Sequence, residues 1–144
     1  MSDIVSDRVF LDAAYAIALV NLDDALHDVA ISLAHHIEKH RTALVTTRPV
    51  LLEIGDALSK PRYRQVASEL LASVSRDPHV EIVELTEPLY LSAFQLFRDR
   101  KDKGWGMTDC VSFIVMESRG MTEALTHDIH FEQAGLRALM RGPS

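Results

Sequence analysis

The segment RVFLD, residues 8–12, is a short apolar run that ends in an aspartate, and it indicates a buried β-strand followed by a turn. Three further segments carry an acidic residue at or soon after a short apolar run: ALVTTRPVLLE (43–53), GMTD (106–109) and EALTHD (123–128). In an open sheet of parallel strands, the turns from strand to helix lie along one edge. We therefore expect four carboxylates to converge in one pocket. They belong to Asp12, Glu53, Asp109 and Asp128.

The segments between these points alternate between strand and helix patterns. Strands are expected at 8–12, 43–47, 80–85, within 123–128 and at 136–140. Helices are expected at 23–41, from a Thr46 or Thr47 cap to a point before Pro61, at 63–75, from Thr86 to about residue 100, and at 109–118 behind a Thr108 cap. This alternation predicts a three-layer α/β/α sandwich with a central, mainly parallel sheet.

Length and composition favour an ordinary globular protein. The 144 residues, 47% hydrophobic and 25% charged, fit a single domain over 1–144. No apolar run approaches the ~20 residues that span a bilayer, and the N-terminus lacks the pattern of a secretory signal. The lone Cys110 excludes an internal disulfide and a cysteine-based zinc site. We expect a cytoplasmic protein without a membrane partner.

The net charge argues against a general nucleic-acid coat but not against a nuclease. Fifteen basic and 21 acidic residues give a formal charge of −6, whereas phosphate binding normally uses a basic face. An acidic active site would itself lower this total. Basic residues are concentrated locally, in SKPRYR (59–64) and RDRKDKGW (98–105).

Clustered carboxylates repel one another, so the expected pocket requires a divalent cation or shared protons. Mg²⁺ and Mn²⁺ prefer carboxylate and water oxygens, and they can orient a phosphodiester and activate a water. Asp12 is the best-placed direct ligand, and Asp109 gains from a helix N-terminus. Glu53 reaches from inside a helix, and Asp128 completes the shell or holds a water. Alone, Asp109 and Asp128 also fit a helix start and a turn.

Several other residues are candidates for supporting roles. Asp56 shares a helix face with Glu53, unless it is simply solvated, and Arg48 or Arg62 is an alternative partner for Glu53. His127 and His130 flank Asp128, and His130 is a candidate for contacting a phosphate or the leaving group. His36 and His40 have zinc-compatible spacing but no apparent third ligand. A last group is expected to contact RNA or support the acids: Thr108, Arg100, Lys103 and Trp105, whose ring either stacks on a base or anchors its loop.

Four segments together resemble the PIN domain, and most closely the VapC-type ribonuclease toxins of bacterial toxin–antitoxin modules. They are RVFLDAAYAIAL (8–19), TTRPVLLEIGDALS (46–59), WGMTDCVSFIVME (105–117) and EALTHDIHFEQAGL (123–136). The resemblance implies an α/β/α sandwich and Mg²⁺- or Mn²⁺-dependent RNA cleavage. Its acidic positions fall on Asp12, Glu53, Asp109 and Asp128, and Thr108 matches as well.

The resemblance also implies a cognate antitoxin that covers the pocket, and a homodimer. One departure is that relatives often carry Ser or Thr just after the first aspartate, where this chain has Ala13 and Ala14, which puts metal affinity in question. The alternatives are a PIN-like scaffold without catalysis, and a nuclease acting on DNA or on other RNA. A phospho-accepting receiver domain fits less well, because Asp12 stands alone after its strand and no lysine follows Lys103.

Overall fold

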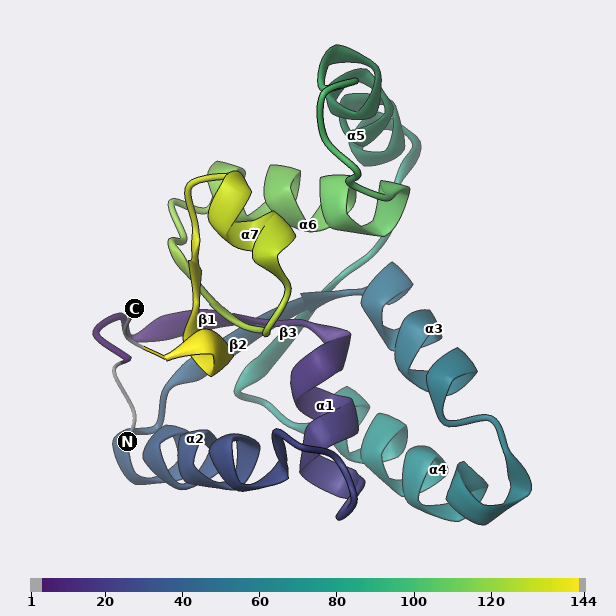
Figure 1. The fold of residues 1–144 in the computed structure, drawn as a ribbon, viewed down its shortest axis with the longest axis vertical. Coiled ribbons are helices and arrows are strands. Elements are labelled where there is room, and N and C mark those ends of the chain that lie inside the picture. Colours follow the sequence, from purple (N-terminus) through teal and green to yellow (C-terminus); the bar gives the residue numbers. More distant parts are fainter. Residues whose placement is uncertain (1–3, 143–144) are drawn as a thin grey trace.

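The structure, a computed structural model, describes residues 4–142 and has a five-stranded parallel sheet at its centre (Figure 1). The strand order is β3-β2-β1-β4-β5, and every neighbouring pair is parallel. The strands are β1 Arg8–Leu11, β2 Ala43–Thr47, β3 Val80–Val83, β4 Glu123–Leu125 and β5 Arg137–Ala138. The parallel sheet predicted from the alternation of patterns is confirmed.

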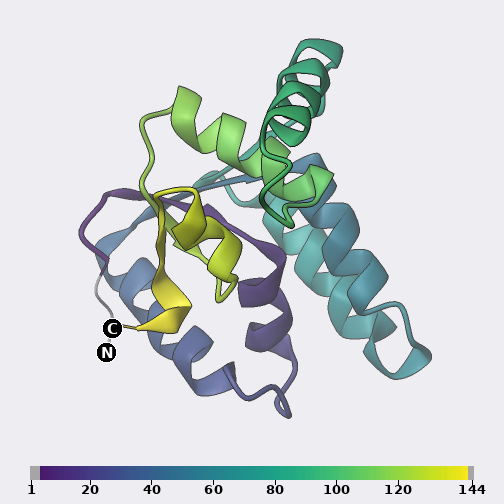
Figure 2. The same ribbon diagram turned by 45° about the horizontal axis from the view of Figure 1, so that its top comes forward.

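Helices cover both faces of this sheet, as the predicted three-layer sandwich requires (Figures 1 and 2). One group consists of α1 Ala13–Val20, α2 His27–His40, α3 Arg48–Ala57 and α4 Pro61–Arg76. The other group consists of α5 Glu87–Asp99, α6 Met107–Ser118 and α7 Ile129–Gln133. A short 3-10 turn, Leu139–Arg141, follows β5. Helix α5 packs on α6 and extends beyond the sandwich at the top of Figure 1.

Local sequence explains where two of the helices begin. The Thr47 hydroxyl accepts the N–H of Val50 at 3.2 Å at the start of α3, and Pro49 occupies the first turn, where its missing N–H costs no hydrogen bond. Thr86 accepts the N–H of Leu89 at 3.3 Å and caps α5 in the same way. The cap predicted at Thr108 is wrong, because α6 begins at Met107, two residues before the predicted start, with Gly106 as the capping residue.

The largest error concerns residues 13–26. The sequence indicated no helix at 13–20, yet these residues form α1 directly after β1, and α2 begins only at His27. Helix α1 has no side-chain cap and no acidic first turn, so it lacks the usual start signals. Its sequence, AAYAIALV, is also apolar on nearly every side, which hides the helical period. Two smaller differences are that β3 ends at Val83 and that α7 was not predicted.

The core lies on both sides of the central strands. Helix α6 is buried on most sides, as its nearly continuous apolar run predicted, with Cys110, Phe113 and Met116 at 6% exposure or less. Helix α5 differs from the expected pattern, because Ala93 is buried as predicted but Phe97 is 43% exposed. Within residues 4–142, no helix combines the length and the apolar character that a membrane span needs.

Candidate metal centre

The four predicted acidic residues line one open cavity of about 600 Å³. They reach it from four places in the chain: the end of β1, the middle of α3, the first turn of α6 and the turn after β4. Ala13, Ala14 and Ile17 of α1 complete one side of the cavity, and Asp56 and Ala57 of α3 extend it. The convergence expected from the order of strands and helices is therefore present.

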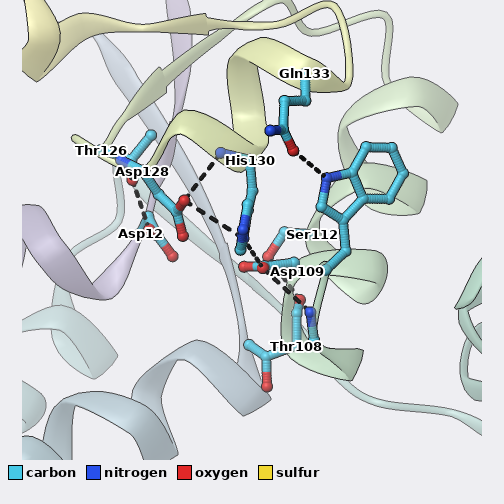
Figure 3. A network of polar contacts seen from close by, with 10 residues as sticks. Asp12, Thr108, Asp109, Ser112, Thr126, Asp128, His130 and Gln133 are labelled. Carbon is cyan, nitrogen blue, oxygen red and sulfur yellow. Dashed lines mark hydrogen bonds and ion pairs between the residues drawn. The ribbon is translucent and has the colours of Figure 1, made fainter. Parts of the chain in front are cut away.

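Asp12 is the most buried of the acids and is fixed by the neighbouring strand. The register of β1 and β4 pairs Leu11 with Leu125, so the residue after each strand lies at the same edge. There the Thr126 hydroxyl donates to Oδ2 of Asp12 at 2.7 Å (Figure 3). Asp12 is only 8% exposed, and this bond holds its carboxylate against the sheet.

Asp109 and Asp128 meet around one imidazole ring. The Nδ1 atom of His130 lies 2.9 Å from Oδ2 of Asp109 and 3.4 Å from Oδ1 of Asp128 (Figure 3). Asp128 also caps α7, because its Oδ1 accepts the backbone N–H of His130 at 2.9 Å. Asp109 accepts the N–H of Gly106 at 3.3 Å at the N-terminus of α6, where the helix dipole favours a negative charge. One donor atom from each of the three side chains can approach a common ion.

Glu53 and Asp56 occupy the solvent side of the cavity, on consecutive turns of α3, and both side chains are exposed. Arg48, one of the two alternative partners for Glu53, instead pairs with Glu84 at 2.6 Å. Asp56 faces the same cavity as Glu53, so the shared helix face expected from their spacing is confirmed.

The crowding of negative charge changes the acidity of two of these groups. Burial raises the pKa of Asp12 from 3.8 to about 6, against the opposing effect of the Thr126 hydrogen bond, and repulsion from Asp109 and Asp128 adds to the rise. Desolvation also raises the pKa of Glu53, to about 7, followed by repulsion from Asp12, Asp109, Asp128 and Asp56. A cation in the cavity would favour the charged form of both groups.

The donor set fits a hard divalent cation. Within the cavity every charged side chain is a carboxylate, and oxygen ligands are the ones that Mg²⁺ and Mn²⁺ prefer. Burial and then mutual repulsion raise the pKa of both Asp12 and Glu53, so their charged forms are disfavoured until a cation binds. The carboxylates of the cavity that would hold such an ion belong to Asp12, Glu53, Asp109 and Asp128. The donor atoms that lie within 4.8 Å of one another belong to Asp109, Asp128 and His130, so Asp12 and Glu53 would have to reach the ion from farther away.

One of the two roles predicted for the tryptophan in the loop before α6 does not fit the structure. The base-stacking role of Trp105 is wrong in this fold, because the side chain is 5% exposed and packs edge-on against Phe113 at 5.0 Å. Its indole N–H donates to Gln133 at 3.0 Å, so the alternative role, anchoring the loop, is the one the structure supports. Arg100 lies over this ring at 5.0 Å and pairs with Asp102 at 3.0 Å.

The remaining candidates divide between the site and the rest of the surface. Lys103 lies in the same loop as Trp105, 3.8 Å from Asp102. Thr108 precedes Asp109, and Figure 3 shows its hydroxyl directed away from the hydrogen-bonded carboxylates. His127 is exposed beside Asp128. His36 and His40 stack on each other at 4.2 Å between ring centres, and no third ligand joins them among residues 4–142.

Two contributors were not predicted from the sequence. Thr126 was missed because its contact with Asp12 depends on the register of β1 and β4. Gly106 was missed because the start of α6 was placed two residues late. The sequence did contain a signal for Thr126, because this hydroxyl residue stands two positions before Asp128 in the segment LTHD.

Comparison with known proteins identifies the family. The family model for the PIN domain matches residues 9–136, which include all four acids. The chain belongs to the PIN domain family. This match confirms the family suggested by the four sequence segments. A comparison with curated proteins found no match.

Among solved structures, the crystal structure of Mycobacterium tuberculosis VapC20, described as a sarcin-ricin loop cleaving toxin, is similar to this PIN domain with a TM-score of 0.77. The two chains share 23% identity, and the alignment covers 89% of this chain and 95% of VapC20. The fold is therefore that of a VapC toxin over almost the full length of both chains.

The two alanines that follow the first aspartate, where PIN relatives often carry Ser or Thr, lie in the wall of the cavity. Ala13 and Ala14 line the cavity without hydroxyl groups. Asp12 nevertheless has a hydroxyl partner, because Thr126 donates to it from the turn after β4, and a backbone hydrogen bond from Ala13 adds to it. In this PIN domain the support of the first aspartate comes from the turn that follows the adjacent strand.

Proposed function

We propose that this PIN domain is an endoribonuclease that depends on Mg²⁺ or Mn²⁺. The observation that carries the proposal is the meeting of Asp12, Glu53, Asp109 and Asp128 in one open cavity at the end of a parallel sheet. Raised pKa values for Asp12 and Glu53 support a site adapted to a cation, since crowded carboxylates would otherwise tend to share protons.

A bound divalent cation would act there as a Lewis acid on a phosphodiester and favour attack by water. The chain's own residues do the positioning. Thr126 holds Asp12 against β1, and His130 holds Asp109 beside Asp128. Glu53, on the exposed side of the cavity, is placed to accept a proton from an attacking water.

The substrate must reach an acidic cavity in a protein of net charge −6. The loop at residues 100–106 leads directly into the first turn of α6, where Asp109 lies, and it carries Arg100, Lys101 and Lys103. These side chains would offset the repulsion between RNA phosphates and the carboxylates as the strand enters. The openness of the cavity to solvent suits a polymer substrate.

We also infer that the protein acts in the cytoplasm as the toxin of a toxin–antitoxin pair, by analogy with VapC20, which shares its fold. A toxin requires a cognate antitoxin, and the apolar wall formed by Ala13, Ala14 and Ile17 gives such a partner a surface beside the acids. The analogy is tested in cells. Expression should stop growth, Asp12→Asn should restore it, and the product of an adjacent gene should relieve the arrest.

A second copy of the chain is the partner that fits helix α5. Tyr90, Leu91, Phe94 and Phe97 lie on α5 beside the buried Ala93, and each is at least 36% exposed. Exposed apolar patches of this kind mark protein contacts, and pairing two such faces would give the expected homodimer.

Cleavage of RNA by the purified protein tests the nuclease assignment. We expect Mn²⁺-stimulated cleavage by the unsubstituted chain, no cleavage by Asp12→Asn or Asp109→Asn, and normal cleavage by the control Asp99→Asn, an exposed acid at the end of α5. Equal activity in all four proteins would remove the catalytic assignment. An inactive but folded unsubstituted chain would favour the scaffold alternative, and cleavage of DNA in preference to RNA would change the substrate class.

A further inference from the structure

His130 occupies a position between two of the acids that the metal site itself does not explain. Its Nδ1 atom lies 2.9 Å from Oδ2 of Asp109 and 3.4 Å from Oδ1 of Asp128. Among the hydrogen bonds of residues 4–142, those to Asp109 fall on Oδ2 and those to Asp128 fall on Oδ1. One oxygen of each carboxylate is thus held by the protein while the other remains available to a ligand.

The histidine is itself held in place from several directions. It lies in the first turn of α7, and the next residue, Phe131, is fully buried. Phe131 packs edge-on against Phe113 of α6 at 5.0 Å, which fixes α7 to the helix that carries Asp109. At the other end of α7, Gln133 accepts the indole N–H of Trp105. These contacts fasten α7 both to α6 and to the loop before it.

We propose that His130 is a positioning residue that orients Asp109 and Asp128 for cation binding. The inference rests on the proposed metal-dependent function and deepens it. With hydrogen on Nδ1, the ring donates to Asp109 and lies close enough to Asp128 to reduce the repulsion between the two carboxylates. Both carboxylates then keep their free oxygens directed toward the cavity before a cation arrives.

The chemistry of metal sites supports such a role. Carboxylates that bind metals are usually hydrogen-bonded by neighbouring groups, and loss of such a partner typically lowers metal affinity by about 10–100-fold. The competing role is direct coordination of the cation by the imidazole, since one donor atom each from Asp109, Asp128 and His130 lies within 4.8 Å of the others. The 2.9 Å separation of Nδ1 from Oδ2 is a hydrogen-bond distance and favours the positioning role.

Two substitutions separate these roles. His130→Leu removes the N–H donor and retains much of the side-chain volume. His130→Asn retains a donor, because its side-chain amide nitrogen is the same number of bonds from the backbone as Nδ1. The matched control is His127→Leu, on the other side of Asp128, where the side chain is exposed.

The experiment measures Mn²⁺ binding to the purified full-length, metal-free protein, using the electron paramagnetic resonance signal of free Mn²⁺, with thermal melting as a check on folding. We expect His130→Leu to weaken binding by about 10–100-fold. His130→Asn should recover most of the affinity, and His127→Leu should bind as the unsubstituted chain does.

Unchanged affinity in His130→Leu would overturn the proposal. Equal weakening in His130→Asn and His130→Leu would also overturn it, in favour of direct coordination by the imidazole. If the Leu variant does not fold, the Asn variant still decides, because a large loss of affinity in a folded Asn variant contradicts the donor role. Absence of Mn²⁺ binding by the unsubstituted chain is a different result, which removes the metal-dependent function itself.

Discussion

Replacing Asp12 with asparagine should stabilise the protein while removing its function. Asp12 is 8% exposed, and in the folded chain burial and neighbouring acids raise its pKa from 3.8 to about 6. The ionised carboxylate is therefore unfavourable in the fold without a cation. Asparagine has nearly the same shape and is always neutral, and its side-chain oxygen can still accept the hydrogen bond from Thr126.

The size of this stabilisation and its dependence on pH both follow from the two pKa values of Asp12. At 1.36 kcal/mol per pH unit, the rise from 3.8 to about 6 corresponds to about 3 kcal/mol. Because the folded-state pKa is the higher one, Asp12 favours folding fully below pH 3.8, and this contribution is lost as the pH rises through 6. The advantage of Asp12→Asn should therefore be near zero at pH 3.8 and complete above pH 6.

Thermal melting in the presence of a chelator measures this difference. At pH 7.5 the Asp12→Asn variant should melt roughly 6–12 °C above the unsubstituted chain, given 2–4 °C per kcal/mol for a protein of this size. Added Mn²⁺ should raise the melting temperature of the unsubstituted chain and leave that of the variant unchanged. A variant that is less stable than the unsubstituted chain at pH 7.5 would show that burial of the charged Asp12 carboxylate does not destabilise the fold.

Three further substitutions test other parts of the structure. Glu123→Ala should cost about 1–3 kcal/mol in urea unfolding, because the buried carboxylate pairs with Arg137 and accepts two backbone N–H groups; an unchanged midpoint would contradict this. Trp105→Ala should lower stability by about 3–5 kcal/mol, whereas a purely RNA-binding tryptophan would leave stability unchanged. Phe97→Glu should shift the protein toward monomer in sedimentation experiments, and Gln95→Glu, also on α5, should not; a dimer that survives Phe97→Glu would exclude this face as the interface.

The architecture could be predicted from the sequence because the apolar runs, the helix caps and the alternation of elements all indicated a parallel α/β sheet. Apolar runs, threonine caps such as Thr47 and Thr86, and the prolines that follow them predicted most elements within a few residues. The convergence of the acids followed from topology alone, since residues after parallel strands share one edge of the sheet. Helix α1 was not predicted, because its residues are apolar on nearly every side and therefore show no helical period.

The details of the site depend on three-dimensional features that a single sequence does not contain. The Thr126 contact with Asp12 is fixed by strand register, and the His130 contact with Asp109 joins residues of two separate helices. For Trp105, the neighbouring residues suggested a surface role, but the side chain is buried. Its neighbours Arg100, Lys101 and Lys103 are typical of a nucleic-acid surface, yet the ring completes an aromatic cluster in the interior.

The proposed metal site can be located by a crystal structure of the protein grown with Mn²⁺, in which anomalous scattering shows the position of the ion. We expect a peak within coordination distance of the carboxylates of Asp12, Asp109 and Asp128, on the side that Glu53 faces. A fully occupied ion elsewhere on the molecule, with these carboxylates left to solvent, would contradict the proposed metal site.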